Sequence, residues 1–299
     1  MCRRVALDSP SSLKDHGLGR LKGDSMRLNT YHYMAVACLV LTGSWSPHTR
    51  FPMPGSACCQ AQEQERQNGL SALIEDVSSF HVGGGAFVQT EPYAGKDARV
   101  YPAPVVAYEG ERLYIRSAIV GYRIIADKGV MIGPQVQPRI EGFSGDDSPF
   151  LHGMHTRNWS VDGGVNIEAV TPIGLLGVSI VSDLLGRNRG QEVEFRYLIM
   201  FPLFGFHFIP SGGVRWKSDS LVDYYYGVRS NEVRPDRPAY QGEQAFDPFL
   251  RLVIRHNLTK HWSLFSDAQY EWLAGEITDS PIVSKDHQLS VTAGVLYAW

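Results

Sequence analysis

The sequence predicts an all-β fold: a transmembrane antiparallel β-barrel of the outer-membrane type, with about 12 strands. Three observations predict it. The chain ends in a segment that alternates apolar and polar residues and closes on aromatic ones. Several earlier segments of roughly ten residues, the length of a membrane-crossing strand, repeat this alternation. Aromatic residues make up 11% of the chain, yet no stretch after residue 60 has the length and apolarity of a membrane helix.

The closing segment, 289–299, carries the clearest pattern. Side chains alternate across a strand, so every second residue shares a face. Ser290, Thr292 and Gly294 lie on the mostly polar face, with Leu296 as its exception. The other face is apolar and consists of Leu289, Val291, Ala293, Val295, Tyr297 and Trp299. This pattern is typical of the last strand of a bacterial barrel, although a C-terminal strand of a soluble β-sandwich also fits this segment taken alone.

Internal segments repeat the alternation at 159–169, 191–201, 250–255 and 262–272. Aromatic residues gather at the segment ends, as the interfacial girdles of a barrel require. A charge on the inner face would be costly in a sandwich core but is well solvated in a wet lumen. We therefore expect these charged side chains to face the lumen: Glu194, Arg196, Arg251, Arg255, Asp267 and Glu271.

Further strands are expected at 78–88, 98–109, 112–125, 129–143, 173–185 and 204–217. Tight turns separate many of them, for example Glu109-Gly110-Glu111 and Asp127-Lys128-Gly129. The assigned segments number about eleven, whereas bacterial barrels have an even number of strands. One strand is therefore either falsely assigned or missing, with 219–228 as the candidate for the missing one.

Loop lengths predict the topology of the second half of the barrel. Such barrels keep both termini in the periplasm, with short periplasmic turns and longer outer loops. Counting back from the C-terminus places 274–286, 218–245, 186–190 and 144–156 outside. The turns at 257–260, near 202 and at 171–172 are then periplasmic, so the lengths follow the rule.

The N-terminal part is expected to be a leader over 1–61. A short apolar core at 34–41 follows Arg27, and small residues near Ala57 and Ala61 suit signal cleavage. All the cysteines, Cys2, Cys38, Cys58 and Cys59, lie within this leader, so a processed chain would have no thiol. A short periplasmic segment at 62–77 and the barrel at 78–299 complete the predicted organisation.

The sequence assigns no catalytic, cofactor-binding or metal-binding residue. His207 and Ser211 lie four apart, which in a strand means about 13 Å, beyond the reach of a nucleophile and its base. The acidic pair Asp146-Asp147 is interpreted as a solvated loop. The net charge of −3 does not suggest a nucleic-acid partner. Outer-membrane lipid is the expected surrounding, and the cell outer membrane the expected location.

The chain resembles the MipA/OmpV family of MltA-interacting and OmpV-type outer-membrane proteins over most of residues 80–299. The motifs are Tyr-Ala-Gly-Lys-Asp at 93–97, Pro-Val-Val-Ala-Tyr at 104–108, Gly-Tyr-Arg at 121–123, Leu-His-Gly-Met at 151–154 with Arg157, Tyr-Tyr-Gly-Val at 225–228, Asp-Ser-Pro-Ile-Val at 279–283, and Gln-Leu-Ser-Val-Thr-Ala-Gly at 288–294. Each motif is weak, but their order together is fairly specific. The terminal Trp299 departs from the more usual Phe.

The resemblance implies an outer-membrane barrel without a known enzymatic activity or cofactor. It implies a scaffold that brings a murein-degrading lytic transglycosylase together with a penicillin-binding protein. It also implies that Val291, Val295, Tyr297 and Trp299 form the signal read by the barrel-insertion machinery. A porin-like channel and a surface adhesin remain open as alternatives, and an outer-membrane hydrolase is a weaker one.

Overall fold

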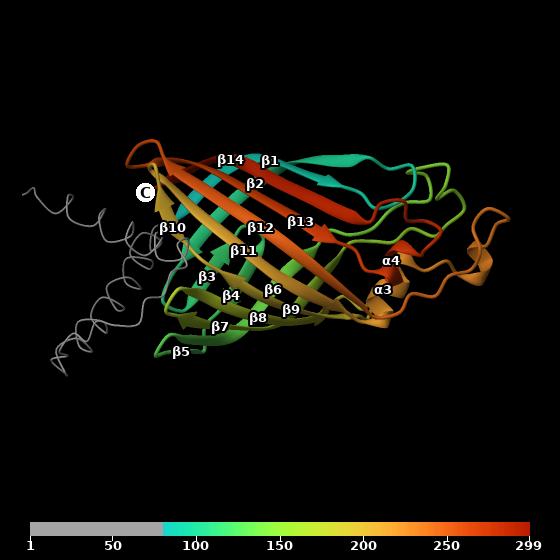
Figure 1. Cartoon of the computed structure of the whole chain (residues 1–299), viewed down its shortest axis with the longest axis horizontal. Coiled ribbons are helices and arrows are strands. Elements are labelled where there is room, and N and C mark those ends of the chain that lie inside the picture. Colours follow the sequence, from blue (N-terminus) through green and yellow to red (C-terminus); the bar gives the residue numbers. More distant parts are fainter. Residues whose placement is uncertain (1–79) are drawn as a thin grey trace, which may run out of the picture. The chain divides into compact units, whose positions relative to one another are not determined.

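The computed structural model describes residues 80–299, which form a closed antiparallel β-barrel of twelve strands (Figure 1). The expected fold class is therefore confirmed. The predicted leader at 1–61 and the predicted periplasmic segment at 62–77 lie outside the described residues. The described chain begins at Phe80, directly before the first strand, β1 (His81–Thr90).

Strands that follow one another in sequence pair as neighbours around the barrel. The remaining strands are β2 (Ala98–Glu109), β3 (Leu113–Arg116), β4 (Ile119–Tyr122), β5 (Ile125–Asp127), β6 (Val130–Arg139), β7 (Ser160–Thr171), β8 (Gly174–Asp183), β9 (Gln191–Leu198), β10 (Phe201–Leu203), β11 (Phe206–Lys217), β12 (Ala245–Asn257), β13 (Trp262–Trp272) and β14 (His287–Ala298). The 14 labelled strands correspond to twelve strands of the barrel wall. β4 and β5 are two parts of one interrupted strand that pairs with β6, and β9 and β10 are two parts of another that pairs with β11.

The barrel closes by pairing its last strand with its first. In β14, Ala298 pairs with His81 and Ser290 with Gln89, and the other edge of β14 pairs with β13 from Tyr297↔Trp262 to His287↔Trp272. Closure satisfies the backbone groups that an open sheet would leave at its edges. The closing strand predicted from the alternating pattern therefore holds the seam of the barrel.

The missing strand lies in a different place from the one predicted. The segment assigned as one strand at 112–125 is a hairpin, β3 and β4, that turns at Ser117 and Ala118. Ser117 takes a positive φ of 59° without glycine, proline or asparagine beside it, so no ordinary turn signal marked the reversal. The candidate at 219–228 is wrong, because helix α3 (Asp219–Tyr226) occupies it.

Alternation divides the strands into an outward apolar face and an inward polar face. On β7, Val165 points outward and is 42% exposed, while Asn166 and Glu168 point inward and are buried. Phe195 on β9 and Leu250 on β12 are likewise outward, with 47% and 59% of their surfaces exposed. A soluble sandwich has the opposite arrangement, with apolar residues inside, so the sandwich alternative fails on these strands.

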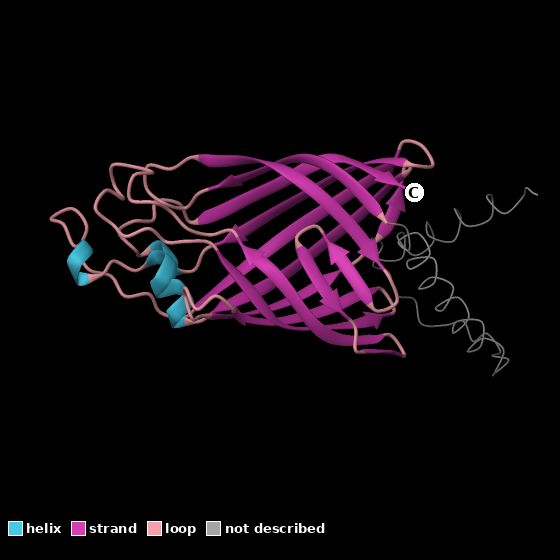
Figure 2. Ribbon diagram, turned by 180° about the vertical axis from the view of Figure 1, so that it is seen from behind, coloured by secondary structure: helices cyan, strands magenta, loops and turns pink. Residues whose placement is uncertain are grey.

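The two ends of the barrel differ. One end, the turn end, carries the C-terminus and short connections such as 128–129, 172–173 and 204–205 (Figure 2). The other, the loop end, carries the longer connections, with α3, the 3₁₀ turn η1 (Ser230–Glu232) and α4 (Gly275–Thr278). Among residues 80–299, no helix has both the length and the apolarity needed to cross a membrane.

Candidate functional site: the charged barrel interior and its loop cap

Ion pairs cross the barrel interior between strands that are not neighbours. Arg116 on β3 donates from Nη1 to Glu168 Oε1 on β7 at 2.5 Å, and it also contacts Glu109 on β2. Arg123, in the break between β4 and β5, binds Glu109 Oε2 at 2.5 Å. Because β4 and β6 separate β3 from β7 along the wall, the Arg116–Glu168 pair can form only through the lumen.

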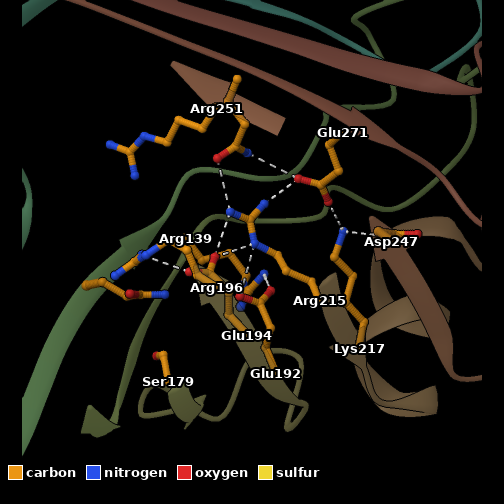
Figure 3. A network of polar contacts seen from close by, with 12 residues as sticks. Arg139, Ser179, Glu192, Glu194, Arg196, Arg215, Lys217, Asp247, Arg251 and Glu271 are labelled. Carbon is orange, nitrogen blue, oxygen red and sulfur yellow. Dashed lines mark hydrogen bonds and ion pairs between the residues drawn. The ribbon is translucent and has the colours of Figure 1, made fainter. Parts of the chain in front are cut away.

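A second charged layer lies closer to the loop end (Figure 3). Arg215 on β11 binds Glu194 Oε2 at 2.8 Å and contacts Glu271 on β13. Lys217, two residues further along β11, lies 3.0 Å from Glu271 Oε1 and 2.8 Å from Asp247 Oδ2. Each cation thus serves more than one carboxylate, which makes a network rather than a set of separate pairs.

Arg139 extends the network to the opposite wall. From β6 it binds Asp162 Oδ2 on β7 at 2.6 Å and Glu192 Oε2 on β9 at 3.0 Å. β7 and β8 lie between β6 and β9 in the wall, so this contact also spans the lumen. The charged layers are therefore held from several sides of the barrel at once.

Several of these charged side chains are almost completely shielded from solvent. Exposure is 0% for Glu168 and Asp247, 3% for Lys217 and Glu271, and 7% for Arg139 and Glu192. Their partners are less deeply buried, with 34% of the Arg116 side chain and 18% of the Arg215 side chain exposed. Charges as deeply buried as Lys217 and Asp247 are retained only when they are paired and hydrogen-bonded. A wide water-filled channel would leave them accessible, so side chains fill the barrel at the level of Lys217 and Glu271.

The structure places the predicted charged residues in three groups. Glu194 and Glu271 join the Arg215 network, and Arg196 binds Glu194 Oε1 at 2.9 Å. Arg251 Nη2 pairs with Asp267 Oδ2 at 2.5 Å across β12 and β13. Arg255 lies towards the turn end, where its Nη2 is 2.5 Å from His81 Nε2.

The residues that hold the network together do not stand out in the sequence: Arg139, Arg215, Lys217, Glu168 and Glu192. Each lies on a segment already assigned as a strand. Their position in the alternating pattern could have identified them, because every second residue of a strand lies on the same face. Glu168 shares the polar face of 159–169, and Glu192 shares the face of Glu194 and Arg196. The pairing between distant strands carries no sequence signature.

The loops at the loop end fold into a cap with its own hydrophobic core. Tyr93 of the β1–β2 loop meets Phe143 of the β6–β7 loop edge to face at 4.8 Å and stacks on Tyr226 of α3 at 5.8 Å, measured between ring centroids. Residues from four loops share this core: Tyr93, Phe143, Leu151, Met154, Leu221, Val222, Tyr225, Tyr226, Val228, Leu273, Ile277 and Ile282. The outer loops thus form a packed cap instead of separate arms.

A buried ion pair fastens the cap. Arg157 Nη2 binds Glu232 Oε2 at 2.8 Å, with 1% and 0% of the two side chains exposed. Burial alone would raise the pKa of Glu232, but hydrogen bonds from Arg157 and from the backbone amides of Arg229 and His155 outweigh it and lower the pKa to about 2. Glu232 is therefore ionised at neutral pH and ties η1 to the β6–β7 loop.

The cap rests on the charged layer beneath it. Tyr226 is buried, and its pKa is raised well above 10.0, first by burial and then by the carboxylates of Glu141, Asp247 and Glu271, with Lys217 opposing them. The Ala274 amide, at the start of α4, donates to Asp247 Oδ1 of the network at 2.8 Å, so the cap contacts the charged layer directly. Cap and charged layer therefore close the loop end together.

Within residues 80–299, no three His, Cys, Asp or Glu side chains cluster in a way that could hold a metal ion. His207 and Ser211 both lie in β11, where they pair with Arg255 and Arg251 of β12. His207 and Ser211 therefore lie four residues apart along one strand, as the sequence predicts.

Comparison with known proteins places residues 82–299 within the family described as MltA-interacting protein MipA. The MltA-interacting protein of Escherichia coli K12 is 29% identical over 221 residues, covering 73% of this chain and 89% of that protein. The outer membrane protein OmpV of Vibrio cholerae is 25% identical, covering 71% and 84%. Among solved structures, the COG4313 outer membrane channel from Pseudomonas putida F1 matches with a TM-score of 0.38 and 11% identity, over 75% of this chain and 96% of that one.

Proposed function

The chain belongs to the MltA-interacting protein MipA family, and on this premise we propose that it is a non-enzymatic outer-membrane scaffold for murein-remodelling enzymes. The partners proposed are a lytic transglycosylase and a penicillin-binding protein. The name of the Escherichia coli relative supports the first of them. Location in the outer membrane follows from the barrel and from relatives named as outer membrane proteins.

The observation that carries this proposal is the filled interior. Buried, paired charges occupy the lumen, and the cap covers its loop end. A barrel closed in this way has little use for its lumen and can act only through its rims and its wall. Murein lies in the periplasm, and short turns face the periplasm in such barrels. The turn end is therefore the face that we assign to the partner enzymes.

The turn end carries apolar side chains at positions where polar ones are the rule. Phe204, in the β10–β11 turn, is 89% exposed, and Ile173, in the β7–β8 turn, is 75% exposed. Single exposed apolar residues are common, but large ones at turn tips favour contact with another surface. A partner with an apolar groove would bury both.

Phe204 is also held against its backbone preference. Leu203 pairs with Phe206, so Phe204 and Gly205 form a two-residue hairpin loop, with φ values of 52° and 79°. Positive φ at both positions defines a turn in which asparagine followed by glycine is preferred, and a bulky aromatic residue is strained. Strain kept at an exposed position indicates a use for the side chain other than folding.

The test exploits a second turn of the same geometry. Lys128 and Gly129 join β5 to β6 with φ values of 49° and 79°. Phe204→Asn should fold at least as well as the wild type, and it should bind a purified lytic transglycosylase more weakly. Lys128→Asn makes the same backbone change without removing an apolar side chain, so its binding should stay unchanged.

Two outcomes decide between the candidate functions. Undiminished binding by Phe204→Asn and by Ile173→Asn would remove the turn end as the docking face. Conductance in planar bilayers separates scaffold from channel, and we expect none above background. Steady single-channel currents would replace the scaffold proposal with the porin-like alternative.

A further inference from the structure

The barrel wall has a window next to β2. The β3–β4 hairpin is short and turns at Ser117 and Ala118, partway along the wall (Figure 2). β3 pairs with β2 only from Ala107 to Glu109. Among the described residues, the rest of β2, at 98–106, therefore pairs with β1 alone. β6 pairs with β4 only at Gln135 and Val136.

Prolines line the two edges of the window, at positions where a backbone N–H would otherwise have no hydrogen-bond partner. Ser117 N donates to the Val106 carbonyl, so even-numbered residues of β2 direct their backbone groups away from β1. Pro102 and Pro104 share this parity and face the window. Ile124 N donates to the Ile132 carbonyl, which gives Pro138 of β6 the same orientation on the far side. Proline has no N–H, so at these three positions the edges expose no donor to lipid, and they discourage pairing with a further strand.

A cavity of about 700 Å³ lies at the loop-end side of the window. It is lined by Arg99 and Tyr101, which share the inward parity of Glu109 on β2. Ile140 and Trp159, also in its lining, are 50% and 54% exposed, and Trp159 precedes the inward-facing Ser160 of β7. The cavity is therefore bordered by residues from the inner face and by residues exposed on the outside.

The polar part of this cavity carries both signs of charge. Arg99 Nη2 donates to the Gly142 carbonyl at 2.7 Å, and Arg99 also pairs with Glu91 Oε1 at 3.0 Å and with Asp147 Oδ2 at 3.4 Å. Lys96 Nζ lies 2.6 Å from the same Asp147 oxygen. Glu141 binds Arg139 through Oε1, while its Oε2 is buried and has no hydrogen-bond partner within residues 80–299. A buried carboxylate oxygen in this state favours a ligand that brings an N–H donor.

The apolar part faces the membrane. Val100, 67% exposed, lies with Pro102 on the outward face of β2, opposite the outward Trp159. Tyr101 is 36% exposed even though it points inward, because no neighbouring strand covers it. Gly85 pairs with Ala103, so the inner wall beside the window is built from small residues. The window therefore has an apolar outer frame and a polar inner end.

We propose that the window is a lateral binding site for a membrane lipid whose head group carries both an amine and a phosphate. Its ammonium group donates to Glu141 Oε2, and its phosphate accepts from Arg99 beside the Glu91 and Asp147 carboxylates. Its acyl chains lie against Ile140 and Trp159 in the cavity and against Val100 beyond it. The site is separate from the proposed docking face at the turn end, so either can fail without the other.

The first test asks whether the window is open. The barrel has no cysteine after Cys59, so single cysteines report cleanly. In vesicles containing a long-chain alkyl maleimide, Tyr101→Cys should react as fast as Ala268→Cys on the outward face of β13. Ser179→Cys, inward behind a complete wall, should react about tenfold more slowly, a difference of about 1.4 kcal/mol. Equal protection of Tyr101→Cys and Ser179→Cys would overturn the proposal.

The second test identifies the ligand by native mass spectrometry of protein taken from vesicles with equal phosphatidylethanolamine and phosphatidylglycerol. One phosphatidylethanolamine should stay bound. Thr156→Trp, which fills the cavity, should lose it, while Gln241→Trp, in the cap but outside the cavity, should keep it. Glu141→Gln should retain both lipids equally. Retention of neither lipid by the wild type, or lipid retention by Thr156→Trp, would refute the assignment.

Discussion

The barrel and its cap are built in opposite ways. In the barrel, apolar side chains such as Val165 and Leu250 face outward, and charged ones such as Glu168 and Lys217 are buried inside. In the cap, Leu221, Tyr225 and Ile277 are buried inside, as in a soluble domain. One chain therefore uses two solvents, lipid around the wall and water around the loops, and its burial pattern reverses at the boundary.

The contrast shows what specifies each region. Hydrophobic burial is non-directional, and it suffices to gather four loops into one cap. The interior relies on directional contacts, because a buried charge without a partner costs several kcal/mol. The cap also serves the interior: by excluding water from Lys217 and Glu271, it lowers the local dielectric and strengthens their pairing.

The largest effect is expected at the barrel seam. Deleting residues 297–299 removes Tyr297, which pairs with Val82 on one side and Trp262 on the other, together with the aromatic end of the proposed assembly signal. The truncated protein should be degraded before it reaches the outer membrane, as measured by immunoblots of membrane fractions. Trp299→Phe keeps the aromatic end and should reach normal levels. Normal levels of the truncated protein would contradict the prediction.

The buried ion pair tests whether the cap is a separate structural unit. Arg157→Ala leaves Glu232 charged and buried without its partner, which should cost about 3–5 kcal/mol. Hydrogen exchange should then accelerate in the cap while the strands stay protected. The exposed pair Arg234–Asp236 is the control, and Arg234→Ala should change stability by less than about 1 kcal/mol. Loss of protection in both regions would show that barrel and cap unfold together.

Two adjacent residues on β7 test whether the lipid face and the inner face of the wall differ in their tolerance of charge. Val165→Arg places a cation on the lipid face and should cost about 2–4 kcal/mol at the membrane midplane. Asn166→Arg should cost less, because the new cation shares the inner face with Glu168. Urea-dependent folding into lipid vesicles measures both variants side by side. Equal losses would mean that the packed interior accommodates a new cation no better than lipid does.

A smaller effect is expected from pH. The pKa of Glu232 is about 2 in the folded cap, below its ordinary value of 4.5. The carboxylate therefore stabilises the cap above pH 4.5, and this contribution is lost as the pH falls from 4.5 towards 2. Tryptophan fluorescence or hydrogen exchange in this range should report loosening of the cap. In Glu232→Gln this pH dependence should disappear.

Most of the wall could be predicted from the sequence, because alternation fixes both the strand and its face. The closing strand and the segments around Val165, Phe195 and Leu250 follow from period two alone. The β3–β4 reversal could not be predicted, since Ser117 and Ala118 carry no turn signature. The break in β9–β10 after Leu198 was likewise without a signal.

The cap and the ion network were harder to predict. α3 was assigned as a strand candidate, yet Leu221, Val222, Tyr225 and Tyr226 recur at helical spacing, so the signal was present. The cross-lumen pairs depend on which strands face each other across a closed cylinder. That follows from strand number and tilt, which local patterns do not contain.

The cross-lumen pairs also constrain the order in which the barrel can assemble. Arg116 and Glu168 are 52 residues apart in sequence, and Lys217 and Glu271 are 54 apart. A half-built sheet would present these charges to hydrocarbon without their partners, at a cost of several kcal/mol each. Insertion of single strands into lipid therefore raises the free energy. The sheet has to close and pair its charges before it inserts fully into the membrane. Such long-range closure is intrinsically slow.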